Sequence, residues 1–238
     1  RQSFDWLLWP DIEHTFLVAR ESGAYLTALR LCRSMGHVWW ARTRMKEGAA
    51  ILEGLLTHPS CQDATVERAH ALCALEWLYM NMGRNKECIP LRREALAIFR
   101  LGGYQEGIAE CLESLAAAYI GRGDYATAAS FLQHLEPDNQ TRGLLALYGG
   151  DFAEARRIYG LMKEPGFDQM MLAQVALGEE NPAEALAIIN DYLAHRAWGD
   201  QRRAQGLEIK ALAACRLGDV EVGVAALEES LRICRRLG

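Results

Sequence analysis

The chain is poor in several residue types and patterns, and each shortage excludes a class of protein. Proline occurs only 6 times in 238 residues and aromatic residues make up 8%, which suits helices better than a β-sandwich. No apolar run approaches the roughly 18 residues needed to span a bilayer, and no signal peptide opens the chain. The formal net charge is −5, with basic residues interspersed among acidic ones. We therefore expect neither membrane insertion nor direct contact with nucleic acid.

Cysteine pairs of the C-x-x-C type are also missing. The seven cysteines are odd in number and scattered, and they are Cys32, Cys61, Cys73, Cys88, Cys111, Cys215 and Cys234. Most fall on apolar helical positions, where cysteine acts as a small hydrophobic residue. This pattern argues against a disulfide framework and favours a reducing compartment, so we expect a cytoplasmic protein. Because the first residue is Arg1 rather than Met, we also expect this chain to be a piece of a longer protein.

Catalytic motifs are absent as well. The sequence contains no G-x-S-x-G, H-E-x-x-H, G-x-G-x-x-G or G-x-x-x-x-G-K-[ST] segment. His70 and Cys73 lie one turn apart, but no second ligand pair is evident, and zinc takes four ligands or three plus water. We therefore interpret them as half-buried helix residues and expect no enzyme, cofactor or metal site. A role as an enzyme accessory subunit or hydrolase is the least favoured alternative.

What the chain does have is a recurring turn, in which a turn residue is followed five positions later by a small residue. The clear copies are Gly83–Cys88, Gly123–Ala128, Gly150–Ala155 and Gly218–Gly223, and the weaker ones are Thr43–Gly48 and Glu180–Ala185. A turn that repeatedly joins two helices is typical of a repeat protein. We predict an all-α fold, an α-α superhelix (solenoid) of about six helix-turn-helix units. It would form one domain over residues 1–238, with a capping segment at 1–20 and repeats at 21–238.

A common register follows if the turn residue is numbered 15 in each unit. Small residues then fall at positions 8 and 20, and aromatic residues such as Trp39 and Tyr79 fall at position 11. The small residues let the two helices of a unit approach closely, while the aromatic ring fills the wider end. Glu76 departs from this pattern at position 8.

The register is weakest over residues 137–200. Short spacings there predict clipped helices, and Asn139 and Arg142 occupy positions where apolar residues belong. Elsewhere the residue after the turn suits a helix N-cap, and Pro182 suits the first helical position. The N-cap candidates are Asp124, Asp151, Asn181 and Asp219.

Several segments together resemble a known family. The segments are 39–40, 47–48, 52–56, 94–102, 107–116, 123–125 and 227–238, with Glu13, His14 and Leu17 before them. They are similar to the tetratricopeptide region of large bacterial signalling ATPases and transcription regulators, including LuxR-type and antibiotic-regulatory-type activators. The resemblance implies a C-terminal sensor or scaffold arm, whose ATPase and DNA-binding helix-turn-helix would lie outside this chain.

In this repeat class, positions 2, 5, 9, 12 and 13 of the first helix line the concave side. The candidate ligand-binding residues there are Arg30, Arg33, His37, Trp40, His70, Trp77, Asn81, Glu110 and Glu113, and later units add Gln174, Glu208 and Arg216. Two tryptophans beside arginine and histidine are costly to expose without a purpose. The alternative is that Trp40 and Trp77 pack against a neighbouring repeat or the N-terminal helix.

The favoured interpretation is non-catalytic recognition by a sensor arm of a bacterial regulator. The alternative is a free-standing adaptor that holds a partner peptide in its concave groove. The ligand would be a protein, a peptide or a small-molecule effector, with an anionic end near Arg30 and Arg33 and an apolar middle at the tryptophans. Self-association stays open.

Overall fold

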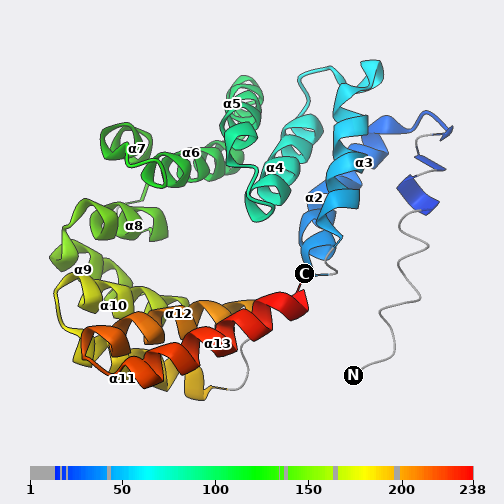
Figure 1. Cartoon of the computed structure of the whole chain (residues 1–238). Coiled ribbons are helices and arrows are strands. Elements are labelled where there is room, and N and C mark those ends of the chain that lie inside the picture. The colour runs from blue at the N-terminus through cyan, green and yellow to red at the C-terminus, as the bar shows by residue number, and fades with distance from the viewer. Residues whose placement is uncertain are drawn as a thin grey trace. The chain divides into compact units, whose positions relative to one another are not determined.

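The computed structural model describes residues 14–16, 18–19, 21–41, 44–133, 135–136, 139–162, 166–195 and 199–237. Within these residues all regular structure is helical and no strand occurs, so the all-α prediction is confirmed (Figure 1). The chain divides into two compact units, Arg1–Ala118 and Tyr119–Gly238. Most of the predicted capping segment at 1–20, and Thr43 of the first predicted turn, lie outside the described residues.

The first unit is a stack of helices joined by short connections. Its elements are α2 (Tyr25–Ala41), α3 (Met45–Thr57), the 3₁₀ turn η1 (Pro59–Cys61), α4 (Val66–Asn81), α5 (Asn85–Leu101) and α6 (Gln105–Ile120), whose last two residues belong to the second unit. Helix α2 packs on α3 and also on α4, and α4 packs on α5. The first helix of one pair therefore stacks on the first helix of the next.

The second unit continues the same alternation of helices. Its elements are α7 (Tyr125–Leu132), α8 (Gln140–Gly149), α9 (Phe152–Leu161), α10 (Phe167–Gly178), α11 (Pro182–Ala194), α12 (Asp200–Arg216) and α13 (Val220–Leu237). From α8 to α13 each helix packs on the next, and α10 also contacts α8 and α12. Contacts limited to near neighbours are what a helical repeat architecture predicts.

The predicted turns adopt the backbone conformation that glycine favours. Gly83, Gly123, Gly150 and Gly218 have φ of +75°, +75°, +85° and +86°, and Glu180 has φ of +59°. The residue after each of them donates its N–H to the carbonyl five residues earlier, at 2.8 to 3.0 Å. This bond satisfies a carbonyl at the end of the preceding helix, as in a Schellman motif. The turn predictions at these five residues are therefore confirmed.

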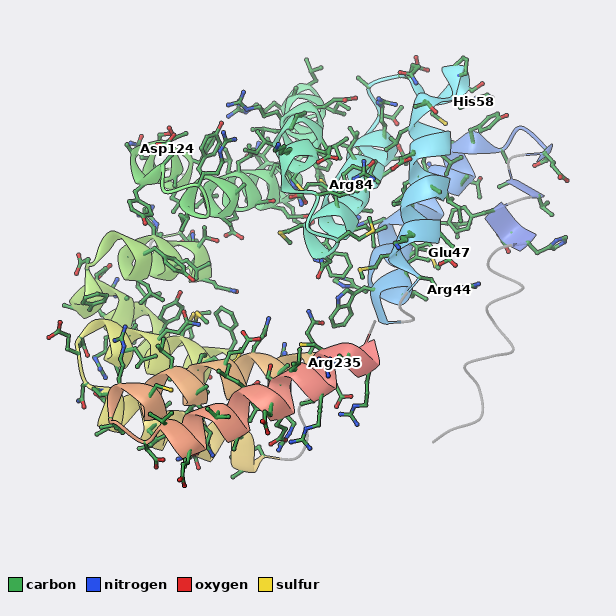
Figure 2. All side chains as sticks on the ribbon, in the orientation of Figure 1. Arg44, Glu47, His58, Arg84, Asp124 and Arg235 are labelled. Carbon is green, nitrogen blue, oxygen red and sulfur yellow. The ribbon has the colours of Figure 1, made fainter. Side chains whose placement is uncertain are left out.

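The helix starts after these turns are also as predicted. Each candidate N-cap accepts a hydrogen bond from the backbone N–H three residues later, and the pairs are Asp124 with Thr127, Asp151 with Glu154, Asn181 with Glu184 and Asp219 with Val222. Pro182 occupies the start of α11, where a missing N–H leaves nothing unsatisfied. Figure 2 shows Asp124 and Arg84 at two of these turns.

The small residues have the structural role predicted for them. Trp39 is fully buried, and a Cβ atom on Gly48 would lie only 2.4 Å from its ring. Ala128 and Ala155 are also fully buried. Helices can cross closely at these points because no side chain separates them.

The predicted clipped helices are present in the middle of the chain. Helix α7 has 8 residues and α8 has 10, against 17 in α5. Asn139 caps α8 by accepting from the Arg142 N–H at 2.8 Å. The Arg142 guanidinium donates to the carbonyls of Leu132, Leu135 and Glu136. These polar residues thus replace apolar packing by satisfying helix ends.

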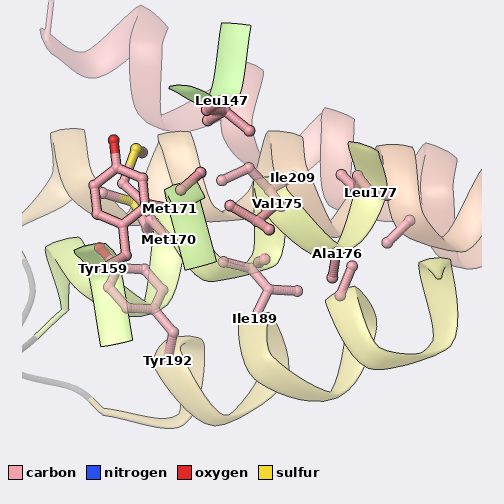
Figure 3. Packing of buried hydrophobic residues seen from close by; sticks show 14 residues of the cluster. Leu147, Tyr159, Met170, Met171, Val175, Ala176, Leu177, Ile189, Tyr192 and Ile209 are labelled. Atoms are coloured by element: carbon pink, nitrogen blue, oxygen red, sulfur yellow. The ribbon is translucent and has the colours of Figure 1, made fainter. Parts of the chain in front are cut away.

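The core of the second unit is centred on α10 (Figure 3). Its buried side chains come from five helices and include Leu147, Tyr159, Met170, Met171, Val175, Ile189, Tyr192 and Ile209. Because α10 has neighbours on several sides, it is apolar over most of its circumference, as expected of a central helix.

Candidate functional site

A cavity of about 310 Å³ lies between α2 and α4 in the first unit, and we call it the α2–α4 cavity. It is lined by Arg33, Gly36, His37, His70, Cys73, Ala74, Trp77, Arg92 and Glu110. Five of the nine residues predicted to bind a ligand therefore surround one space. They come from the first helices of three successive pairs, α2, α4 and α6.

Aromatic rings form one wall of the cavity. The His37 and Trp77 rings meet edge to face with centroids 4.7 Å apart, and those of Trp40 and Trp77 are 6.0 Å apart. Gly36 lies beside the Trp77 ring, and a Cβ atom there would be in ordinary van der Waals contact with it at 3.8 Å. Trp77 is half-buried and lines the cavity, whereas Trp40, which is 37% exposed, lies behind it and outside the lining. Trp77 thus packs against α2 and still lines the cavity.

His70 lies at the boundary between the cavity and the core. Its ring packs edge to face on Phe99 at 5.0 Å and on Tyr104 at 5.5 Å. Burial, followed by the positive charge of Arg33, lowers the pKa of His70, so its neutral form is favoured. Its Nε2 atom is buried and has no hydrogen-bond partner among the described residues.

A buried ion pair forms the floor of the cavity. The side chains of Glu76 and Arg92 are 3% and 5% exposed and pair directly. Ser114 donates to Glu76 Oε1 at 3.1 Å, and Arg92 Nη1 lies 3.2 Å from Glu110 Oε1. Hydrogen bonds from Ser114 and to Glu110 help to stabilise such a pair in the interior, although Arg92 Nε is buried and has no hydrogen-bond partner among the described residues.

The sequence indicated one member of this ion pair, Glu76, but not the other. Glu76 stood out because it occupies a position where a small residue is expected, seven residues before the turn glycine. Arg92, nine residues after the same turn, was not singled out. The equivalent positions in a later unit are Gly143 and Tyr159, where a Cβ atom on the glycine would lie 2.7 Å from the ring. The ion pair therefore replaces a small–aromatic contact.

Cys73 is part of a thiol pair. Its Sγ lies 3.9 Å from Sγ of Cys111, and both thiols are free and buried. The hydrogen bond with Cys111, together with burial, raises the pKa of the Cys73 thiol. Among the described residues no group of three or more His, Cys, Asp or Glu side chains could hold a metal ion.

The other predicted residues lie around the cavity and not in its lining. Arg30 pairs with Glu67 at 3.0 Å and lines a smaller hollow of about 170 Å³ that Arg33 and His70 also border. The Asn81 amide donates to the Trp77 carbonyl at 2.8 Å. Glu113 is half-buried, and burial followed by the charge of Glu110 raises its pKa.

A larger hollow of about 600 Å³ lies in the second unit, and we call it the second-unit hollow. Its lining is mainly apolar and comes from α8, α9, α10 and α12, with Tyr148, Phe152, Met170 and Leu212 among the residues. Gln174, Glu208 and Arg216, which the repeat register placed on the inner face, also line it. The apolar lining was not anticipated, because the register was weakest here.

No helix in the described part of the chain combines the length and apolar character needed to cross a membrane.

Comparison with known proteins supports the repeat fold. The tetratricopeptide repeat family model matches residues 78–137. No curated protein matches the chain. A solved tetratricopeptide repeat protein from Parabacteroides merdae is 13% identical, and the match covers 94% of this chain and 92% of that one with a TM-score of 0.67.

Two other solved structures are less similar in shape. A putative kinesin light chain from Podosopora anserina, with nearly identical TPR-like repeats, is 16% identical over 89% of this chain and 97% of that one, with a TM-score of 0.40. BtubC (BKLC) from P. vanneervenii is 13% identical over 95% and 87%, with a TM-score of 0.43. Of the three structures described, the Parabacteroides protein is similar enough to inform the fold, which is tetratricopeptide-like.

Proposed function

We propose that this chain is a non-catalytic binding module that holds a segment of a partner protein in the α2–α4 cavity. The observation that carries the proposal is the convergence of Arg33, His37, His70, Trp77 and Glu110 on one cavity. An aromatic wall next to charges of both signs is typical of a site that anchors one side chain and orients its neighbours.

The charges indicate which peptide chemistry fits. Arg92 is already committed to Glu76 and Glu110, and Arg30 is paired with Glu67. Arg33 is therefore the arginine that lines the cavity outside this buried network. A peptide with an aromatic or large aliphatic side chain against Trp77, next to an acidic residue facing Arg33, matches this lining.

A finer version of the proposal assigns the module to a cytoplasmic bacterial transcription regulator, as its sensor arm. It rests on the resemblance of segments such as 94–102 and 107–116 to the tetratricopeptide regions of such regulators. The free, mostly buried cysteines support a reducing compartment. The adaptor alternative fits the same cavity equally well. An upstream ATPase and helix-turn-helix encoded in the same reading frame would separate the two.

The binding proposal is tested with a peptide library. Random heptapeptides displayed on phage are selected on the chain, and the affinities of enriched peptides are measured by fluorescence polarisation. We expect enrichment of an aromatic residue next to Asp or Glu. Trp77→Leu should weaken binding by about 30-fold, equivalent to roughly 2 kcal/mol, as for an interface anchor. Leucine keeps much of the apolar packing, so the thermal melt should change little.

Tyr148→Ala is the matched control, because Tyr148 is 54% exposed and lines the second-unit hollow. It should leave the affinity unchanged. Loss of binding in Tyr148→Ala but not in Trp77→Leu would place the ligand in the second unit and contradict the proposal. So would a Trp77→Leu variant that binds normally.

A further inference from the structure

The last helix, α13, has an exposed apolar stripe in addition to the face that packs on α12. The buried face consists of Gly223, Ala226, Ser230 and Ile233. The second row, which we call the α13 stripe, consists of Val220, Val224, Leu227, Leu231 and Cys234. Val220, Val224, Leu227 and Leu231 are 48 to 59% exposed, and Cys234 is exposed.

Comparison with α5 shows that this row occupies positions that are normally covered. Residues six, nine, thirteen and sixteen positions after the turn glycine are Ile89, Arg92, Leu96 and Phe99 in α5, all at most 9% exposed. Helix α6 packs on two of them: Arg92 pairs with Glu110, and a Cβ atom on Gly107 would lie 2.7 Å from the Phe99 ring. The same offsets after Gly218 give Val224, Leu227, Leu231 and Cys234.

Helix α11 gives the same result in the second unit. Ile189, nine positions after Glu180, is fully buried, and Leu186 and Leu193, six and thirteen positions after it, are half-buried. Helix α12 covers Leu193, since a Cβ atom on Gly206 would lie 3.0 Å from its side chain. Among the described residues no helix follows α13 to cover its stripe.

The spacing of the stripe indicates what kind of helix would cover it. Its residues alternate at intervals of four and three, which is the a/d seam of a two-helix coiled coil. Glu221, Glu228 and Arg235 follow the seam on its exposed flank. The acidic residues come first along the helix and the basic residue comes last. Figure 2 shows Arg235 near the end of α13.

We propose that the α13 stripe pairs with the α13 stripe of a second copy of this chain, antiparallel and related by a two-fold axis. In that arrangement the flank that carries Glu221, Glu228 and Arg235 faces the same flank of the second helix, which runs in the opposite direction. Glu221 therefore meets Arg235 of the second copy, and Val224 packs beside Cys234 of the second copy. Glu228 lies nearest the axis and faces Glu228 of the second copy, with the positive charge of Arg232, which donates to the Glu228 carbonyl, close by. A parallel pair would place Glu221 opposite no basic residue.

The expected dimer is reversible. A single 18-residue helix face is smaller than the roughly 800 Å² per partner that specific stable complexes bury. We expect a dissociation constant on the order of micromolar, with hydrophobic contact providing the attraction and the terminal charge pairs setting the direction.

Sedimentation velocity of the 238-residue chain between about 1 and 200 µM tests the pairing. The wild type should shift from monomer to dimer, and Leu231→Glu should weaken dimerisation at least tenfold. Val222→Glu is the matched control, because Val222 lies on the same helix outside the stripe and is 37% exposed. Circular dichroism melts check that both variants fold. A wild type that stays monomeric, or a Leu231→Glu variant that dimerises normally, overturns the proposal.

Disulfide crosslinking tests the antiparallel register. In a Cys215→Ser background, Val224→Cys should form a covalent dimer with Cys234 of the second copy under mild oxidation. These two positions are too far apart on one helix to bridge within a chain. Val222→Cys should form no such dimer. Equal crosslinking by both variants, or crosslinking through Cys234 alone, contradicts the antiparallel arrangement.

Discussion

Two glycines of α3 (Met45–Thr57) have opposite surroundings. A Cβ atom on Gly48 would lie 2.4 Å from the Trp39 ring, whereas one on Gly54 would meet nothing within 4 Å. Gly48→Ala should therefore destabilise the protein by about 1–3 kcal/mol through overpacking. Gly54→Ala should stabilise it by about 0.5–1 kcal/mol through helix propensity. Urea denaturation of both variants checks the sign, and equal effects would contradict the close crossing at Trp39.

The buried Glu76–Arg92 pair can be tested against its counterpart in a later unit. Removing one partner leaves an uncompensated buried charge, so Glu76→Gly and Arg92→Tyr should each cost about 3–5 kcal/mol. The double variant reproduces the Gly143–Tyr159 contact and should cost much less than the sum of the two. Denaturant melts of the four proteins form the cycle. Additive losses would show that positions 76 and 92 do not form a contact equivalent to that between Gly143 and Tyr159.

His70 predicts a pH dependence of stability. Its pKa is lowered in the folded state by burial and then by Arg33, while Glu110, Glu106 and Glu67 oppose the shift. At pH values between this folded pKa and the ordinary value near 6.5, the unfolded chain binds more protons than the folded chain does. Stability should therefore fall as the pH drops below about 6.5. The free energy of unfolding of the wild type, minus that of the His70→Gln variant, should decrease from pH 7 to pH 5. A difference that does not change with pH contradicts this assignment.

At the scale of single residues, the sequence indicated Glu76 as unusual but could not identify its partner. Arg92 lies sixteen residues away on another helix, and only the crossing of α4 and α5 brings the two together. Arg142 shows the same limit. Its apparent misfit in the repeat pattern is explained by carbonyls at the end of α7, and the place where α7 ends is not encoded in the repeat register.

At the scale of elements, the turns and caps were predictable because their chemistry is local. A positive φ after a helix favours glycine, and an Asp or Asn one residue later caps the next helix. These signals lie within a few residues of each other. Glu180 was recognised as a turn by spacing alone, although its side chain does not favour that conformation.

Glu180 offers a direct test of the turn assignment, because its φ of +59° is strained for a residue with a Cβ atom. Glu180→Gly should relieve this strain and stabilise the protein by up to about 1 kcal/mol. Gly150→Ala should destabilise it, since Gly150 has φ of +85°. Thermal melts at constant pH measure both. A destabilised Glu180→Gly variant would show that the side chain makes a contact that outweighs the strain.

At the scale of the whole molecule, each unit is held together by contacts between neighbouring helices. Such architectures present long faces and seldom enclose a deep pocket, and the α2–α4 cavity lies on one of these faces. The prediction that residues 21–238 form one continuous solenoid stays a prediction, as does the ligand-binding role of the nine residues.

The candidate site was predictable to the extent that it follows from helix register. Arg33, His37, His70 and Trp77 line one cavity because helical periodicity places them on the facing sides of α2 and α4. Register does not determine which charges are already paired. Arg30 is held by Glu67, and Asn81 bonds to its own helix, so the sequence overestimated how many groups are available to a ligand.

The most direct test of the binding claim is the indole N–H signal of Trp77 in a ¹H–¹⁵N spectrum, assigned by its loss in Trp77→Phe. On titration with an acidic–aromatic peptide selected on the chain, this signal should shift with the same dissociation constant as binding. The signal of Trp39, which is fully buried, should not move. A peptide that binds while the Trp77 signal stays in place would contradict the assignment of the α2–α4 cavity as the binding site.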